Sequence, residues 1–569
     1  MYVITYEIRL MPKQEWYRGN SPLSFMLRVF YFKEDIMKRN ILVTGAWPYA
    51  NYLLHIGHLV ALLPGDVIAR YYRMNGDNVV YVSGSDCHGT PITERAKKEG
   101  KTPAEIAMYY HNEDVKSLEK AGFSYDMYTS TESDYHKEKV MKYFKEMYDN
   151  GNIYEKEEVQ DYCPKCDKFL SDREIVGICP HCGGEAKGDQ CDSCLASLES
   201  NELKDRRCAT CGSTPEPRKN KHLYLELSKF QKDIEELIKE RESIWRKNAL
   251  NESKKFLAMG LIDRAATRQL DWGIKIPVDG YEDKRIYVWI EAVLGYITTC
   301  ERVLEERGEN FKDFITDPNL ISYYSIGKDN IPFHTIIFPA ILKAIGEGMS
   351  LPTHIISCEF MNMSDEKMSK SKGNLITIND IIDKFGKDTV RYFMIANGPE
   401  KKDSNFSEND LILAHNKFLV GGLGNFINRN VSFINKKFDG IVKEGIINED
   451  IIKLTKDTYS EVSKLIEAGE LRAALDKVFD YVSEANKFYD NSTPWIQVKE
   501  DIDAFNNTTY TCMYMIANLS NLLRPFIPDT TDRIKSLLGI EENGWNEVTL
   551  SGDIKLNDIG LLFERIDVK

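Results

Sequence analysis

The apolar positions of the chain follow a strand-like pattern in some segments and a helical pattern in others. Two short apolar runs, at 41–44 and 79–82, predict buried strands, since each run ends at a loop rich in small residues. The helical patterns of this region are 55–73, 103–121 and 134–149. Strands that alternate with helices in this way predict a parallel sheet covered by helices on both faces.

The alternation is interrupted between about 152 and 220, where cysteine, glycine and charged residues replace the hydrophobic period. Regular structure is expected to return at 221–227, and the αβ pattern resumes over 286–357. Strand candidates in this second part are 321–326 and 353–357. The sequence therefore predicts a parallel sheet split by an insertion that something other than a hydrophobic core holds together.

After about residue 405 no further strands are expected. Ser407 and the acidic residues behind it form a capping-box pattern that should open a long helix. Further long helical patterns are 450–467, 470–491 and 507–523. This part of the chain is predicted to be an all-α domain.

The length of 569 residues is too great for one core, so several domains are expected. Six segments are predicted: an N-terminal extension (1–38), the first half of the sheet domain (39–151), the insertion (152–265), the second half of the sheet domain (266–350), a linker (351–405) and the α-helical domain (406–569). Met37 directly precedes the first strand pattern, so we expect translation to start there and the upstream stretch to be disordered or misannotated.

The net charge of −14 argues against a polyanionic partner, but it does not exclude nucleic acid that binds to a local basic face. No apolar run approaches the roughly 18 residues that a membrane span needs, so no membrane association is expected. No clean signal or transit sequence is present, and a cytoplasmic protein is expected.

Eight of the twelve cysteines form four Cys-x-x-Cys pairs within the insertion. They are Cys163 and Cys166, Cys179 and Cys182, Cys191 and Cys194, and Cys208 and Cys211. Eight thiolates suffice for two tetrahedral metal sites of structural type, because four protein ligands close each site. Iron–sulfur ligation is an alternative, but the repeated knuckle spacing favours zinc. The spacing alone does not say which pairs share an ion.

Two short segments offer groups that suit a nucleotide triphosphate. His55 and His58 lie on one face in the first turn of the predicted helix, whose N-terminus favours phosphate, and Gly57 allows a close approach to the backbone. Lys367 and Lys370, in a Ser-rich loop, could bracket a phosphate chain. The P-loop pattern is absent, so a different cradle is expected.

These two segments, in this order on a split parallel sheet, resemble those of the class I aminoacyl-tRNA synthetases, and within that class the methionyl-tRNA synthetases. The resemblance covers nearly the whole chain from residue 39. Its segments are 43–51 (Val-Thr-Gly-Ala-Trp-Pro-Tyr-Ala-Asn), 84–91 (Gly-Ser-Asp-Cys-His-Gly-Thr-Pro), 287–296 (Tyr-Val-Trp-Ile-Glu-Ala-Val-Leu-Gly-Tyr) and 327–334 (Gly-Lys-Asp-Asn-Ile-Pro-Phe-His). The chain departs from the family at Glu291, where many members have Asp, and at Trp47, where many have Leu.

The resemblance implies a split Rossmann fold and an ATP-dependent ligation of L-methionine to tRNA(Met) through a methionyl-adenylate, with release of AMP and pyrophosphate. His55, His58, Lys367 and Lys370 would be catalytic and, with Mg²⁺, would stabilise the phosphates by position and charge. The ATP site implied by the resemblance comprises these four residues with Tyr49, Asn51 and Gly57.

The resemblance also implies a methionine pocket rich in aromatic rings. Its residues would be Trp47, Tyr49, Asp86, Trp289, Ala292, Tyr296, Asn330 and His334. Asp86 follows the second strand, at the edge where open α/β sheets bind ligands, and would pair with the substrate ammonium group. Aromatic edges and hydroxyl or imidazole donors suit a thioether.

In the helical domain, Asn425 and Arg429 are i, i+4 neighbours that match the family's anticodon-reading helix, and Trp495 offers a stacking platform for a base. The alternative for Trp495 is burial within the bundle. For the cysteines, the resemblance implies nesting: the second and third pairs share one zinc ion, and the first and fourth pairs share the other.

Two other functions stay open. The insertion is too small for the editing domain of the leucine, isoleucine and valine enzymes, but another class I synthetase remains possible, as does a non-catalytic, zinc-stabilised tRNA-binding protein. The chain ends soon after the helical domain, so a monomer is expected.

Overall fold

The structure is a computed structural model whose described residues fall between 38 and 567 of the chain. The gaps within this range are 171–173, 189–190, 192–193, 195–197, 199–201, 364–365, 368–374 and 542–543. The expectation about residues 1–37 therefore lies outside the described residues. From Arg39 onward the chain forms a single unit.

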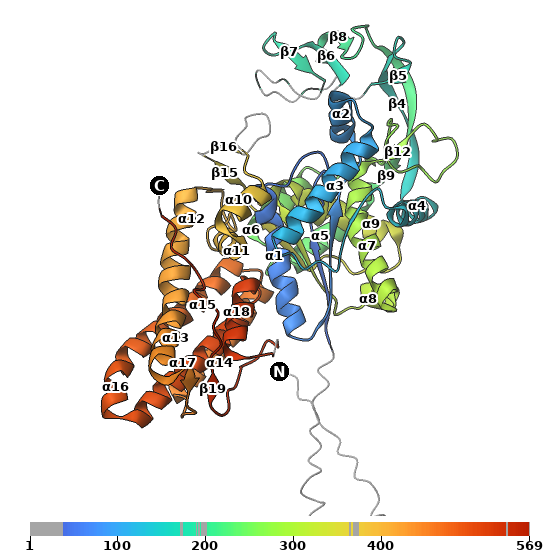
Figure 1. Cartoon of the computed structure of the whole chain (residues 1–569). Coiled ribbons are helices and arrows are strands. Elements are labelled where there is room, and N and C mark those ends of the chain that lie inside the picture. Colours follow the sequence, from blue (N-terminus) through green and yellow to red (C-terminus); the bar gives the residue numbers. More distant parts are fainter. Residues whose placement is uncertain are drawn as a thin grey trace, which may run out of the picture. The chain divides into compact units, whose positions relative to one another are not determined.

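A five-stranded parallel sheet in the order β14-β13-β1-β2-β3 forms the centre of the first part of the chain (Figure 1). Its strands are β1 (Asn40–Gly45), β2 (Asn78–Ser85), β3 (Met127–Ser130), β13 (Ile321–Gly327) and β14 (His354–Cys358). The four strands expected from the apolar runs are confirmed, whereas the short β3 was not expected. The sheet is split in sequence between β3 and β13, as predicted.

Helices cover both faces of this sheet. They are α1 (Ile56–Met74), α3 (Pro103–Lys120), α4 (Asp134–Asp149), α7 (Val288–Arg307), α8 (Phe311–Ile315) and α9 (Phe338–Ile345), and α2 (Thr90–Glu99) packs against α3. Alternate β1 residues enter different cores: Ile41 packs in the cluster that contains α1, and Leu42 packs in the cluster that contains α7. Because successive strand side chains point to opposite faces, a continuous apolar run marks a strand that is buried on both sides.

The insertion contains long antiparallel strands that the sequence did not reveal. β4 (Ile153–Cys163) pairs with β9 (Glu216–Leu225) along its length, and β5 (Lys168–Phe169) and β10 (Arg264–Ala265) complete a sheet in the order β10-β9-β4-β5. Much of the β4–β9 ladder is exposed, with cross-strand ion pairs such as Lys219–Glu157 at 2.7 Å. A ladder that meets water on both faces lacks the hydrophobic alternation by which strands are predicted.

Short elements complete the insertion, the second half of the sheet domain and the linker. In the insertion, β6 (Ile175–Ile178), β7 (Glu185–Lys187) and β8 (Lys204–Cys208) form a small antiparallel sheet. The elements between there and the C-terminal helices are η3 (Leu227–Phe230), α5 (Gln231–Glu240), α6 (Lys247–Ala258), β11 (Thr267–Arg268), β12 (Arg285–Ile286), η4 (Lys328–Asn330), η5 (Phe333–Ile337), β15 (Met361–Met363), β16 (Glu366–Lys367), α10 (Ile378–Phe385), α11 (Lys387–Ala396) and β17 (Ser404–Asn405).

The C-terminal part is helical, as predicted. Its elements are α12 (Glu408–Ala414), the π-helical segment η7 (His415–Gly424), α13 (Asn425–Phe438), α14 (Glu449–Glu467), α15 (Leu471–Ser492), α16 (Pro494–Glu500), α17 (Ile502–Leu522) and α18 (Pro528–Leu538). Ser407 caps α12 by accepting a hydrogen bond from the Asp410 amide at 3.3 Å. The expectation that strands end at about 405 was wrong in one detail, because β18 (Ile441–Val442) pairs with β19 (Ile554–Lys555).

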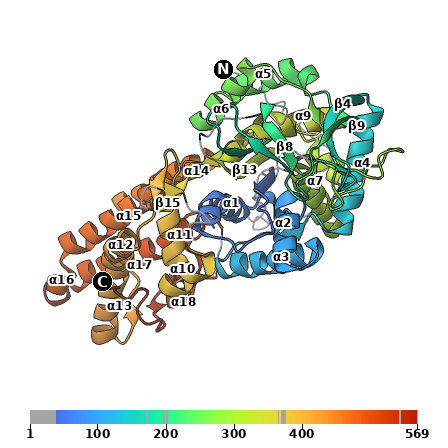
Figure 2. The ribbon, with the colours of Figure 1, turned by 90° about the horizontal axis from the view of Figure 1, so that it is seen from above.

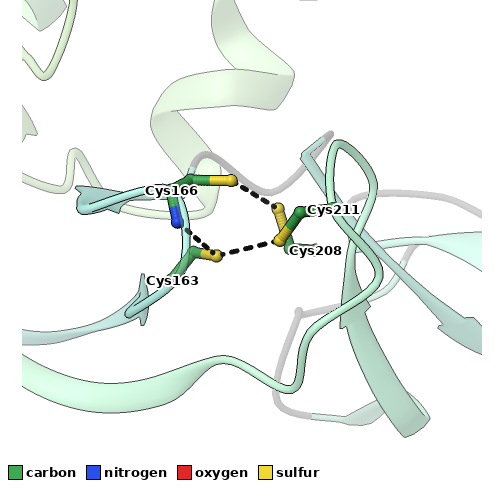
Figure 3. Close-up of side chains that lie close together, drawn as sticks. All are labelled: Cys163, Cys166, Cys208 and Cys211. Atoms are coloured by element: carbon green, nitrogen blue, oxygen red, sulfur yellow. Dashed lines mark hydrogen bonds between the residues drawn. The ribbon is translucent and has the colours of Figure 1, made fainter.

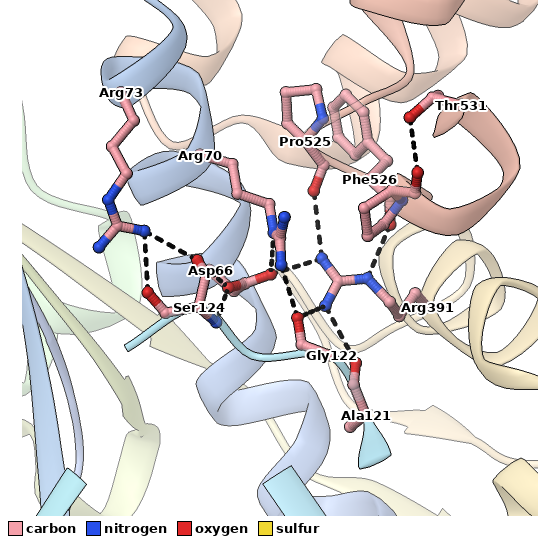
Figure 4. Close-up of polar contacts among 11 residues, drawn as sticks. Asp66, Arg70, Arg73, Ala121, Gly122, Ser124, Arg391, Pro525, Phe526 and Thr531 are labelled. Carbon is pink, nitrogen blue, oxygen red and sulfur yellow. Dashed lines mark hydrogen bonds and ion pairs between the residues drawn. The ribbon is translucent and has the colours of Figure 1, made fainter. Parts of the chain in front are cut away.

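A buried ion pair joins α1 of the sheet domain to α11, and α11 in turn contacts the loop before α18 (Figure 4). Asp66 of α1 and Arg391 of α11 are almost fully buried, and the Arg391 guanidinium lies 2.6 Å from the Asp66 carboxylate. Arg391 also donates to the Phe526 carbonyl at 2.9 Å. Burial alone would raise the pKa of Asp66, but Arg391 and Arg70 outweigh it and lower the pKa to about 2. Figure 2 shows α11 beside α1, at the side from which the orange and red helices extend.

Candidate active site and metal centres

A cavity of about 470 Å³ opens at the carboxyl edge of the parallel sheet, next to the ends of β1, β2 and β13. Strand order reverses at β1, between β13 and β2, which is the position where open α/β sheets bind ligands. All eight residues predicted to bind methionine line this cavity: Trp47, Tyr49, Asp86, Trp289, Ala292, Tyr296, Asn330 and His334. His55, Gly57 and His58 line it as well, whereas Asn51 lies in the turn after Tyr49 and does not. The sheet thus brings together side chains from four separated segments.

The two histidines occupy the start of α1. His55 is the N-cap: its Nδ1 accepts a hydrogen bond from the Gly57 amide at 3.1 Å, and its own amide donates to Nδ1 of His58 at 3.2 Å. The two rings lie 4.0 Å apart between centroids. A ring nitrogen that accepts a backbone N–H carries no proton, so each neutral imidazole holds its proton on Nε2. The capping role thereby fixes the tautomer of both rings.

Tyr296 and His334 form a buried hydrogen-bonded pair in the wall of the cavity. The Tyr296 hydroxyl and His334 Nε2 are 2.7 Å apart, and His334 Nδ1 lies 2.9 Å from the Asn330 carbonyl oxygen. A carbonyl can only accept, so Nδ1 carries the proton of His334 and Nε2 accepts from Tyr296. Burial lowers the pKa of His334 to about 4, which keeps the ring neutral near pH 7.

Trp47 fills a slot made by two glycines. A Cβ atom at Gly84 or at Gly295 would lie 2.6 Å from the Trp47 indole, a distance that side chains do not tolerate. The indole is also 5.7 Å from the ring of buried His136. The absence of a side chain at the two glycines therefore explains how this chain accommodates its tryptophan.

Asp86 is buried at the base of the cavity, and its carboxylate accepts a hydrogen bond from the His88 amide at 3.2 Å. Burial and the nearby charge of Glu291 raise its pKa well above the usual range. His88 and Glu132 form the next layer of polar residues, which sequence reasoning missed. The Cys-His-Gly sequence directly after Asp86 is the sequence feature that could have indicated a role for His88.

The lysine loop is only partly described. β16, which ends at Lys367, pairs with β15, and the preceding residues Glu359, Phe360 and Met361 line the cavity. The Lys367 side chain and all of Lys370 lie outside the described residues. The segment that leads to the lysines thus borders the cavity.

The eight knuckle cysteines form two groups of four. Cys163, Cys166, Cys208 and Cys211 make one group (Figure 3), and Cys179, Cys182, Cys191 and Cys194 make the other. Within each group all sulfur atoms lie within 4.8 Å of one another. The first pair of cysteines thus meets the fourth and the second meets the third, which is the nested arrangement expected from the resemblance.

The residues expected at the anticodon lie together on the helical domain. The Arg429 guanidinium is 4.6 Å from the centre of the Tyr489 ring, which lies 6.1 Å from the Trp495 ring. Asn425, one turn before Arg429, contacts Asn486 at 3.3 Å. Trp495 is 42% exposed, so the alternative of a tryptophan buried in the bundle is wrong.

Comparison with known proteins first defines the class. The family of class I tRNA synthetases (M) matches residues 41–431, and the anticodon binding domain of methionyl tRNA ligase matches residues 442–568. With the parallel sheet and the His55–His58 pair at its edge, this match defines a class I aminoacyl-tRNA synthetase.

The relatives then define the member. The methionine--tRNA ligase 1 of Alkaliphilus oremlandii is 47% identical over 530 residues, which are 93% of this chain and 98% of that protein. The methionine--tRNA ligase of Bacillus cereus (strain 03BB102) is 44% identical over 532 residues, 93% of this chain and 97% of that protein. The chain belongs to the methionyl-tRNA synthetase family.

A solved structure supports the fold. The methionyl-tRNA synthetase of Mycobacterium tuberculosis in complex with methionyl-adenylate has a TM-score of 0.77 and 24% sequence identity, with 93% of this chain and 100% of that chain covered. No helix in the described part of the chain is long and apolar enough to cross a membrane.

Proposed function

We propose that the protein ligates L-methionine to tRNA(Met) in two steps, through a methionyl-adenylate, and releases AMP and pyrophosphate. The observation that carries the proposal is one cavity in which a buried carboxylate, an aromatic pocket and two helix-capping histidines meet. The first group suits an ammonium ion, the second suits a thioether, and the third suits a phosphate.

In the first step the methionine carboxylate attacks the α-phosphorus of ATP, and pyrophosphate leaves. The carboxylate is already a nucleophile, so no general base is needed. His55 and His58 would donate through Nε2 to the oxygens on which negative charge develops, next to the positive end of the α1 dipole. Lys367 and Lys370 would hold the β- and γ-phosphates with Mg²⁺. Catalysis would rest on position and charge.

The methionine side chain would bind among the rings of the cavity. Trp289 meets Tyr49 edge-on with centroids 6.1 Å apart, and it stacks on Phe333 at 3.9 Å. The Tyr296 hydroxyl is committed to His334, so the pocket offers the sulfur polarizable rings in this arrangement. Asp86 would fix the other end of the substrate by pairing with its ammonium group.

A second cavity, of about 960 Å³, shares Tyr49 and Trp289 with the first and extends between the β4–β9 ladder and the Arg268 segment. It would admit the 3′ end of tRNA, whose ribose hydroxyl attacks the adenylate in the second step. Arg268 lies in this cavity with its guanidinium 3.9 Å from the centre of the Tyr287 ring. At the other end of the tRNA, Arg429, Trp495 and Asn425 would read the anticodon by hydrogen bonding and stacking.

Both cysteine groups fit zinc. Four thiolates about 2.3 Å from a tetrahedral zinc ion lie about 3.8 Å apart. The sulfur–sulfur distances here include 3.4 Å between Cys163 and Cys211 and 3.8 Å between Cys179 and Cys194. Four thiolates leave no coordination position for a substrate, so each ion would hold the fold of the insertion and take no part in the reaction.

Charging of tRNA tests the proposal. Radiolabelled methionine should become attached to tRNA(Met) only when ATP is present, with one AMP released for each methionine transferred. A protein that binds this tRNA but attaches no amino acid would contradict the proposal and favour the non-catalytic alternative.

A further inference from the structure

A buried histidine behind the cavity is held between two carboxylates. His88 is 1% exposed; its Nδ1 lies 2.7 Å from Glu291 Oε1, and its Nε2 lies 2.6 Å from Glu132 Oε1. Ionised carboxylates can only accept, so both ring nitrogens donate and His88 is an imidazolium ion. Burial opposes this charge, but Glu291 and Glu132 outweigh it and raise the pKa of His88 to about 10.

The partners come from two segments packed around the end of β2. Glu291 lies in the first turn of α7, and Glu132 precedes α4 and also pairs with Lys137 at 2.8 Å. His136 of α4 is buried as well, and burial lowers its pKa to about 3, so it stays neutral. We define the His88 cluster as Asp86, His88, Glu132, Lys137 and Glu291.

When all three of its carboxyl groups are ionised, the His88 cluster carries one unmatched negative charge, because three carboxylates face two cations. Lys137 and His88 both contact Glu132, and His88 also contacts Glu291. Asp86 is the one member that lines the cavity, and no cationic side chain pairs with it among the described residues. Burial and Glu291 raise the pKa of Asp86, so its ionised form requires a cation, which a ligand in the cavity can supply.

We propose that His88 is a positioning residue that neutralises Glu291 and so reserves the charge of Asp86 for the α-ammonium group of the amino-acid substrate. The inference rests on the proposed function and adds to it the group that sets the charge of the ammonium subsite. Without His88, the uncompensated charge of Glu291 would raise the pKa of Asp86 further and weaken its interaction with the ammonium group. Without Glu291, the imidazolium would be free to pair with Asp86 and compete with the substrate.

A double-mutant cycle tests the charge balance. His88→Gln changes the net charge of the cluster from −1 to −2, and Glu291→Gln changes it to 0, whereas the double variant restores −1. Each single variant should raise the KM for methionine in ATP–pyrophosphate exchange about tenfold, which corresponds to about one pKa unit of lost interaction. The double variant should bind methionine better than either single variant, with the KM for ATP unchanged throughout.

Two inhibitors separate the ammonium subsite from the rest of the pocket. L-Methioninol retains the ammonium group, so its inhibition constant should follow the KM for methionine across the variants. 4-(Methylsulfanyl)butanoic acid lacks that group, so its inhibition constant should not change. His354→Gln is a matched control, because His354 is also largely buried but contacts the Thr353 hydroxyl and the Tyr323 ring in place of carboxylates.

Equal losses of affinity for the two inhibitors would overturn the inference, since they would mean that the whole pocket had changed. If the effects of the two single substitutions on the KM for methionine simply added in the double variant, the inference would also be overturned, because charge balance would then have no role. A wild-type protein without methionine-dependent exchange would instead refute the proposed function, so the two failures are distinguishable.

Discussion

The Tyr296 hydroxyl donates a hydrogen bond to Nε2 of His334 across 2.7 Å, and Nδ1 of the same ring donates to the Asn330 carbonyl. Both nitrogens of a fully buried ring are thus satisfied in one tautomer. The wall of the cavity is therefore fixed before any substrate enters, as tight recognition of a small flexible side chain requires.

Tyr296→Phe removes the donor of this pair. Nε2 of His334 then has no partner, which costs about 1–3 kcal/mol for a buried polar group. We expect a lower melting temperature and a KM for methionine raised about tenfold, with the KM for ATP unchanged. Thermal unfolding and exchange kinetics measure the two effects. An unchanged KM for methionine would show that the pair does not shape the pocket.

The depressed pKa of His334 predicts how stability depends on pH. The ordinary value is 6.5 and the folded value is about 4, so the unfolded chain binds a proton that the folded chain does not. The stabilisation is complete above pH 6.5 and is lost as the pH falls toward 4. The melting temperature of the wild type should therefore fall more between pH 7 and pH 5 than that of His334→Gln. Parallel curves for the two proteins would contradict this account.

The slot around Trp47 predicts a compensating pair of substitutions. Gly295→Ala places a methyl group against the indole and should cost about 1–3 kcal/mol of stability, as overpacking does. Trp47→Leu should relieve the clash, so the double variant should melt above Gly295→Ala alone. Melting temperatures of the three variants test this expectation. Equal melting temperatures for Gly295→Ala and the double variant would mean that Trp47 is not the obstacle.

The grouping of the cysteines predicts the metal content of variants. The wild type should hold two zinc ions per chain. Replacing Cys163 and Cys208 by serine removes ligands from one group only, so one ion should remain. Replacing Cys163 and Cys179 removes a ligand from each group, so the content should fall below one ion. Mass spectrometry of the native protein reads the stoichiometry. The grouping would be contradicted if the variant at Cys163 and Cys208 kept fewer zinc ions than the variant at Cys163 and Cys179.

The sequence predicted the helices and strands in which buried apolar residues follow a regular pattern. β1 and β2 are apolar because helices cover both faces of the sheet, and α1 begins at Ile56 because the side chain of the preceding His55 caps it. The β4–β9 ladder was missed, since water meets both of its faces and no period-2 pattern results.

The sequence could predict the site residues that directly follow strands in recognisable segments. It could not predict contacts between residues that are distant in sequence and that only the fold brings together. The His88 cluster shows the limit. Glu132 and Glu291 lie 44 and 203 positions from His88, and nothing local marks either of them as its partner. Lys367 and Lys370 remain a prediction, because their side chains lie outside the described residues.

ATP–pyrophosphate exchange with a panel of amino acids tests the central claim most directly. The assay requires adenylate formation and reversal in one cavity, without tRNA. Exchange should depend on methionine and be weak or absent with valine, leucine, isoleucine and cysteine, and Lys367→Ala should abolish it while the zinc content persists. Exchange driven by another amino acid and not by methionine would contradict the account.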